Sequence, residues 1–186
     1  DSVVVGAYLD TDTVSDTGSV YVFERDGEGT WTEVQKLTAS DGATSDYFGS
    51  EVSISGDRVV VGAFGDMVIT GSAYIFERDG EGTWTEVQKL TASDGVSSDY
   101  FGYSVSISGE TVLIGAPYDH NDNGIDSGSV YMFDGKSVIN LDNGNQGYRK
   151  LQAALNETLS GDRLAVRSSA FAVDGIINTS SIPLTF

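Results

Sequence analysis

Hydrophobic and polar residues alternate over short segments of this chain. In residues 50–55, apolar side chains alternate with serine, and this period of two predicts a half-buried β-strand. Residues 58–63 and 72–76 are almost continuously apolar, so we expect strands that are buried on both faces. Residues 31–39 mix apolar and charged side chains, which is typical of an outer strand whose charges discourage edge pairing. The pattern predicts an all-β protein.

Glycine-containing turns separate these segments. Gly56-Asp57 leaves two residues between adjacent strands, and glycine in the first of the two positions favours a type II′ hairpin. Residues 26–29 are expected to close the hairpin that leads into residues 31–39. The apolar spacing within residues 31–39 also fits one face of a helix, but the β-branched residues and the flanking glycine turns favour a strand.

The same segments recur along the chain. Residues 23–42 return without change at residues 76–95, about 53 residues later, and this spacing is at the long end of known repeat architectures. The segment Gly-Ser-Val-Tyr-Val-Phe, which begins at Gly18, also returns in closely related form at Gly71 and Gly128. We therefore expect repeats of about 53 residues, each forming a four-stranded antiparallel unit.

The repeats divide the chain into two parts. Residues 1–133 hold a half unit, a full unit and most of a third unit. Residues 134–186 hold the divergent end of the third unit, with one plausible strand at residues 137–141, and a degenerate fourth unit. Such units bury their apolar faces only against neighbours, and we expect about 3.5 of them here. The chain is expected to be either a fragment of a longer protein or an assembling subunit with open edges.

Charge excludes some partners. Ten basic and 28 acidic residues give a net charge of −18, so we expect no binding to nucleic acid, whose phosphates are neutralised by Lys and Arg. The absence of cysteine excludes disulfides and thiolate chemistry. No apolar run approaches the ~20 residues of a transmembrane helix, and we expect no membrane insertion.

Two motifs together resemble the FG-GAP repeat family. Phe101-Gly102 and residues 115–117, Gly-Ala-Pro, carry the motif that gives the family its name, and Phe48-Gly49 with Gly62-Ala63 is a partial copy. The resemblance covers residues 1–133 well and the remainder poorly. It implies β-propeller-like blades, and an extracellular or cell-surface protein that serves in adhesion or in the binding of a protein or polysaccharide ligand.

The family often holds calcium in a loop between the first two strands of a unit, but this chain has only a two-residue turn there. Acidic loops instead follow the Gly-Ala pairs of the first and third units. The third-unit loop has oxygen side chains at positions 1, 3 and 5 and glycine at position 6, as a calcium loop begins, although position 12 is Val130. We expect either a weak Ca²⁺ site or ordinary turn residues. The expected ligands are Asp10, Asp12, Asp16, Asp119, Asn121, Asn123 and Asp126. For Asp41, Asp46, Asp94 and Asp99, turn capping is expected in preference to metal binding.

Catalytic chemistry has little support in the sequence. The single histidine, His120, lies in an acidic loop, and without cysteine few routes to nucleophilic catalysis remain. Carboxylate pairs are plentiful, but none is singled out as an acid and base pair. We expect a protein that is not an enzyme. Asn156 and Asn178 begin N-x-S/T sequons and are the expected glycosylation sites if the protein is secreted by a eukaryote.

Two functions follow from these expectations. The first is a non-enzymatic extracellular β-repeat module whose loops bind a ligand, with Tyr8, Phe64 and Tyr118 either as sugar platforms or as cover for the rim of the blades. The alternative is the structural subunit of an extracellular filament or fibre, in which copies of the chain pair through open edges, head to tail or in a ring.

Overall fold

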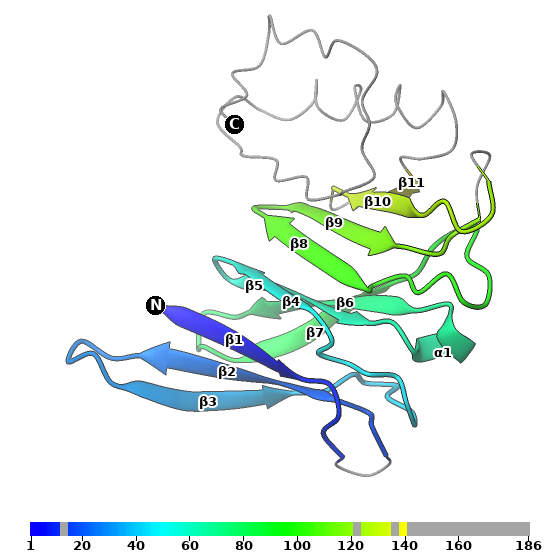
Figure 1. Ribbon diagram of the computed structural model, residues 1–186. Helices are drawn as coiled ribbons and strands as arrows, with labels where there is room; N and C mark the ends of the chain where they lie inside the picture. Colours follow the sequence, from blue (N-terminus) through cyan, green and yellow to red (C-terminus); the bar gives the residue numbers. More distant parts are fainter. Residues whose placement is uncertain (12–14, 121–123, 135–137, 141–186) are drawn as a thin grey trace, which may run out of the picture.

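The computed structural model describes residues 1–11, 15–120, 124–134 and 138–140. These residues form an all-β structure of three antiparallel sheets, which lie one above another along the chain (Figure 1). The first sheet consists of β1 (Ser2–Ala7), β2 (Ser19–Arg25) and β3 (Trp31–Leu37), in that order. The second consists of β4 (Val52–Ser55), β5 (Arg58–Ala63), β6 (Ser72–Arg78) and β7 (Trp84–Leu90), in that order. The third consists of β8 (Ser104–Ser108), β9 (Thr111–Ala116), β10 (Ser129–Phe133) and β11 (Val138–Asn140), in that order.

Within the described residues, the predicted strands are present, with small differences at their ends; the predicted fourth unit lies outside the described residues. The strand predicted at residues 50–55 begins only at Val52, because Ser50 N–H donates to the carbonyl of Tyr47 and so closes a turn. The segment predicted as a loop between β5 and β6 contains one helical turn, α1 (Asp66–Ile69). In the described part of the chain, α1 is the only α-helix, and it is not long and apolar enough to cross a membrane.

The predicted turns form as expected. Ser55 pairs with Arg58 across the β4–β5 hairpin, and φ is +59° at Gly56 but not positive at Asp57, which identifies a type II′ turn. In the β2–β3 hairpin, one carboxylate oxygen of Asp26 accepts the N–H groups of Glu28 and Thr30, both at 2.9 Å. Aspartate therefore stabilises this turn through its own following backbone.

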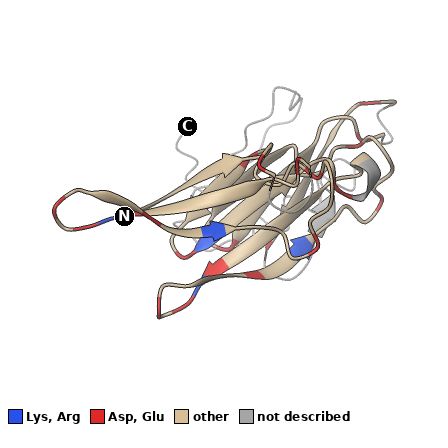
Figure 2. Ribbon diagram, turned by 90° about the horizontal axis from the view of Figure 1, so that it is seen from below, with Lys and Arg blue, Asp and Glu red and all other residues tan. Residues whose placement is uncertain are grey.

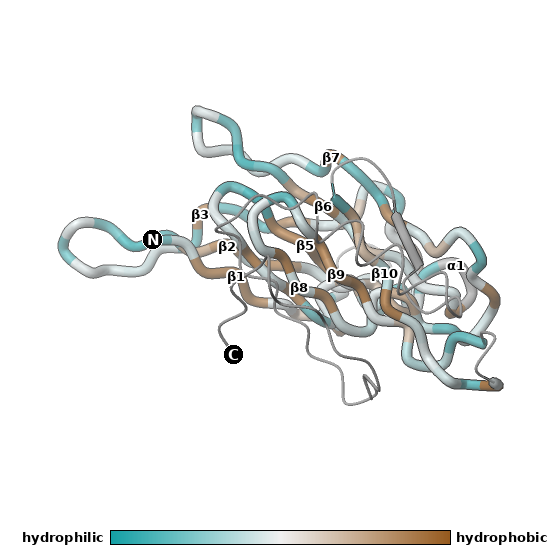
Figure 3. Tube along the Cα trace, turned by 90° about the horizontal axis from the view of Figure 1, so that it is seen from above, coloured by the Kyte–Doolittle hydropathy of each residue, from teal (hydrophilic) through white to brown (hydrophobic). Residues whose placement is uncertain are grey.

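The second sheet is buried on both faces. Val59 and Val61 of β5 pack with the apolar residues of the first sheet, whereas Val60 packs with those of the third sheet. All three valines are fully buried, as the continuous apolar run predicted. Hydrophobic residues accordingly concentrate along the strands, and the turns are hydrophilic (Figure 3). Acidic residues gather in the turns and in the loops at the strand ends (Figure 2).

The Phe-Gly motif joins neighbouring sheets. Phe101 is fully buried and packs edge to face against Tyr131, with 5.1 Å between the ring centroids. Its backbone forms a parallel bridge with Gly71, where φ is +88°. A Cβ at Gly71 would lie 2.0 Å from the carbonyl oxygen of Phe101, so only glycine permits this approach. Gly18 and Phe48 repeat the arrangement between the first two sheets.

Candidate functional site

Several loops meet at one edge of the stacked sheets. Because adjacent strands are antiparallel, β5 ends where β4 begins, and β9 ends where β8 begins. The segments that follow β1, β5 and β9 therefore lie beside the Asp-Tyr-Phe-Gly segments that precede β4 and β8. We call this side of the molecule the loop edge; it comprises residues 8–11, 15–18, 43–50, 64–71, 96–103, 117–120 and 124–128.

In the first unit, Asp10 is held by two groups of its own sheet. Its carboxylate accepts the hydroxyl of Tyr21 at 2.7 Å and lies 3.0 Å from the ammonium of Lys36. The hydrogen bond from Tyr21, followed by that from Lys36, lowers the pKa of Asp10 to about 2. Asp10 is therefore part of an ion pair, and the sequence did not show this because its partners are distant along the chain.

The second unit repeats this arrangement and adds a carboxylate from its neighbour. The Tyr74 hydroxyl lies 2.9 Å from Asp66 and 2.9 Å from Asp41, which belongs to the loop after β3. The Lys89 ammonium binds both carboxylates, with 2.6 Å to Asp41. Burial alone would lower the pKa of Lys89, but its hydrogen bonds to Asp41 and Asp66 outweigh burial and raise it. The lysine thus ties the second unit to the first.

The third unit keeps the tyrosine and the two carboxylates. The Tyr131 hydroxyl lies 2.8 Å from Asp94 and 3.0 Å from Asp119, which is almost fully buried. In the register of β6 and β7, Tyr74 is paired with Lys89, and in the register of β10 and β11 the equivalent pair is Tyr131 and Asn140. We refer to the recurring Asp, Tyr and Lys or Asn positions as the aspartate–tyrosine network.

The other residues predicted as metal ligands have separate surroundings. Asp16 adopts a positive φ of 55° and accepts the Ser15 hydroxyl, and Asp126 lies 3.6 Å from His120 Nδ1. Asp12, Asn121 and Asn123 lie outside the described residues, as do the sequons at Asn156 and Asn178. Within the described ranges, no three His, Cys, Asp or Glu side chains are placed to hold a metal ion together. The calcium site stays a prediction.

Turn capping is confirmed for two aspartates. The carboxylate of Asp46 accepts the Ala43 N–H at 2.6 Å, and Asp99 accepts the Val96 N–H at 2.6 Å. Both side chains are buried, and burial raises the pKa of each carboxyl above its usual value. These residues hold the segments that carry the Phe-Gly motif.

A row of aromatic rings crosses the loop edge. Successive centroids are 6.2 Å apart from Tyr8 to Tyr47, 5.1 Å from Tyr47 to Phe64, 5.8 Å from Phe64 to Tyr100 and 5.3 Å from Tyr100 to Tyr118. Tyr103 adds a branch, 5.6 Å from Phe64. We call this set of six rings the aromatic row. It passes from the first sheet to the third, so all three units contribute to it.

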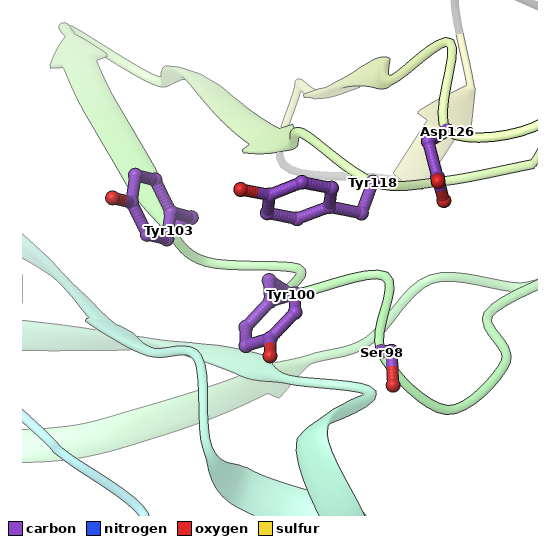
Figure 4. A pocket seen from close by; sticks show the side chains of 5 residues that line it. All are labelled: Ser98, Tyr100, Tyr103, Tyr118 and Asp126. Carbon is purple, nitrogen blue, oxygen red and sulfur yellow. The ribbon is translucent and has the colours of Figure 1, made fainter.

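Two hollows open beside the aromatic row. The larger, of about 730 Å³, is lined by Ala43, Thr44, Ser45, Asp46, Tyr47, Phe64, Gly65, Asp66, Ile69 and Tyr100. The smaller, of about 460 Å³, is lined by Ser98, Tyr100, Tyr103, Tyr118 and Asp126. Figure 4 shows the three tyrosine rings that line the smaller hollow, with Ser98 and Asp126 on the right of the view. Tyr47 and Tyr100, and likewise Ser45 and Ser98, occupy equivalent positions in the repeat. The hollows therefore recur from one unit to the next.

Sequence reasoning found three members of the aromatic row and missed the others. Tyr8, Phe64 and Tyr118 were expected at this edge, whereas Tyr47, Tyr100 and Tyr103 were not. A signal was available, because Tyr precedes the buried Phe in both Asp-Tyr-Phe-Gly segments. Tyr47 and Tyr100 have φ of +57° and +58°, and each Tyr ring joins the surface row while its neighbouring Phe is buried.

Comparison with known proteins identifies the repeats. The sequence model of the FG-GAP repeat matches residues 31–76 and 84–133, which together make up about half of the chain. No curated protein matches the chain significantly.

Proposed function

Because this chain belongs to the FG-GAP repeat family, we propose that it is a non-enzymatic extracellular or cell-surface module that binds a ligand at the loop edge. FG-GAP repeats are generally extracellular β-repeat modules for ligand binding, and the family is generally non-enzymatic. The observation that carries the proposal is the aromatic row with its two hollows. Exposed aromatic side chains beside concave surface are typical of binding sites.

We further propose that the sheets are blades of a β-propeller-like array, with about 3.5 blades encoded in the chain. Their meander order and the buried apolar clusters between successive sheets support this arrangement. In such an array the loop edge is one continuous surface, because each unit places the same segments at the same side.

The binding proposal is tested with a variant of the aromatic row. Tyr103→Ala combined with Tyr118→Ala removes two rings that are about half exposed, so the fold is expected to survive. The unaltered chain and the variant are compared on arrays of glycans and of extracellular proteins. We expect ligands that the unaltered chain retains and the variant loses. If the two bind the same set, the loop edge is not the binding site.

The alternative, a filament subunit, is supported by the outer face of the first sheet. Val3 and Val5 are 41% and 48% exposed, whereas their equivalents Val59 and Val61 in the second sheet are fully buried against the first sheet. Trp31 is also exposed, although its equivalent in β7 is buried. This face thus matches a surface that binds another sheet of the same kind.

Light scattering tests this alternative and the calcium proposal together. The chain is measured with calcium and then with chelator. A monomer near 19.7 kDa would refute self-assembly, a discrete dimer would favour a shared ring, and a polydisperse polymer would favour a fibre. A Val3→Asp variant is expected to abolish any assembly through this face. Assembly that chelator abolishes would support a metal role for the predicted loops.

A further inference from the structure

We infer that the aromatic row binds a linear, uncharged polysaccharide, which lies lengthwise across the successive units. The inference rests on the proposed function, since it names the class of ligand for the loop edge.

The site repeats from one unit to the next. Equivalent positions supply Tyr47 and Tyr100, and both hollows open beside these rings. The five rings from Tyr8 to Tyr118 form one continuous series of contacts, with no centroid more than 6.2 Å from the next. A surface that repeats the same contacts along a line is matched by a ligand that repeats its own units along a line. A single small molecule would occupy only one hollow.

The side chains of the aromatic row and its hollows match the chemistry of a sugar ring. Five of the six rings are tyrosine, which offers an apolar ring for stacking and a hydroxyl for hydrogen bonding. The smaller hollow adds the hydroxyl of Ser98 and the carboxylate of Asp126, which can accept hydrogen bonds from ligand hydroxyls. A pyranose ring has apolar C–H faces and a rim of hydroxyls, and it therefore complements these groups.

The charge of the site disfavours an anionic ligand. Within the described part of the chain, no Lys or Arg lines either hollow, and carboxylates line both. The whole chain carries a net charge of −18. A polyanion would approach this surface against electrostatic repulsion and would find no cation in the hollows. A polysaccharide with anionic sugar units is therefore disfavoured.

A protein ligand fits the site less well. Peptides commonly bind by adding a strand to a sheet edge or by inserting apolar anchors into a pocket. The aromatic row runs over loops and not along an edge strand, and it meets the ends of three different sheets. Open hollows lined by tyrosine suit stacking against the C–H face of a sugar ring better than the insertion of aliphatic side chains.

The test measures the binding of the full chain to a panel of neutral polysaccharides: glucans, mannans, xylans and galactans. Oligomers of the best ligand are then titrated by calorimetry, together with oligouronates as the polyanionic comparison. We expect affinity to rise with oligomer length as more rings are covered, and oligouronates to bind much more weakly at equal length. Tyr103→Ala is expected to raise Kd about tenfold, by analogy with the loss of one stacked base.

The control variant is Val87→Ala, which removes an exposed apolar side chain of β7 that lies outside the aromatic row. It is expected to leave the Kd unchanged, and Tyr103→Phe, which keeps the ring, to retain most of the affinity. The inference is overturned if no neutral polysaccharide binds, if oligouronates bind equally well, or if Tyr103→Ala has no effect. Proteins bound through the aromatic row without any polysaccharide would overturn the inference and leave the proposed function standing, whereas absence of both classes would refute both.

Discussion

Replacing Lys89 by methionine tests whether the aspartate–tyrosine network holds the first two units together. The ammonium of Lys89 lies 2.6 Å from Asp41 of the preceding loop, also pairs with Asp66, and sits 5.2 Å from the centroid of the Tyr74 ring. Methionine has a similar length and keeps the apolar stem, so the substitution removes mainly the charge. The two carboxylates would then face each other around one tyrosine hydroxyl.

The size of the effect follows from burial. The side chain of Lys89 is 26% exposed, that of Asp66 is 11% exposed and that of Asp41 is 50% exposed. Breaking a fully buried ion pair costs about 3–5 kcal/mol, and losing an exposed pair costs about 0.2–1 kcal/mol. With one nearly buried and one exposed carboxylate, we expect a loss of about 2 kcal/mol in the free energy of unfolding. For a chain of this size that corresponds to a fall in Tm of about 4–8 °C.

The assay is thermal and urea unfolding of the unaltered chain, Lys89→Met and the matched control Lys36→Met. Lys36 occupies the same register position in the first unit, where it pairs with Asp10 of its own sheet and not with a carboxylate shown to come from a neighbouring unit. We expect the control to lose less stability than Lys89→Met. Equal losses in the two variants, or no loss in Lys89→Met, would refute the view that the lysine joins neighbouring units.

The pH dependence gives a second check on the same variant. The pKa of Lys89 is raised above 10.5, so its stabilising effect is complete below that value and is lost as pH rises through the raised pKa. Burial alone would raise the pKa of Asp41, but hydrogen bonds from Lys89 and Tyr74 lower it below 3.8. The effect of Asp41 is therefore lost as pH falls through that lowered pKa. The stability difference between the unaltered chain and Lys89→Met should thus be constant between pH 3.8 and 10.5 and should shrink outside this range.

Two further changes test other parts of the fold. Gly71→Ala places a Cβ against the carbonyl of Phe101 and should lower the free energy of unfolding, measured in urea, by about 3 kcal/mol. The control Gly80→Ala meets open space and should change this free energy by less than about 0.5 kcal/mol. Similar values for both variants would contradict the close approach of Gly71 to Phe101. The buried carboxyl of Asp46 has a raised pKa, so its protonation stabilises the fold as pH falls through that pKa toward 3.8. Asp46→Asn should therefore remove this gain in the free energy of unfolding at acidic pH. An unchanged pH dependence of stability in the variant would exclude Asp46 as its source.

The sequence alone determined the local structure of the described residues. Alternation with serine located β4, continuous apolar runs located β5 and β6, and Gly56 specified its hairpin turn. These features depend on neighbouring residues, on side-chain direction along a strand and on the backbone freedom of glycine. The repeat also predicted that sheets pack on one another, since an apolar run that faces both ways needs cover on both sides.

Only the tertiary structure decided where the polar and aromatic side chains lie. Asp10 was expected either to bind a metal or to be an ordinary turn residue, and its ion pair with Lys36 depends on β3 lying beside β2. Asp41 and Lys89 are separated by nearly a whole repeat, and their contact exists only because the second sheet stacks on the first. The aromatic row arises in the same way, since Tyr47 meets Phe64 through the folded edge and not through local sequence. Contacts between units depend on how whole sheets stack, and local periodicity carries no information about that geometry.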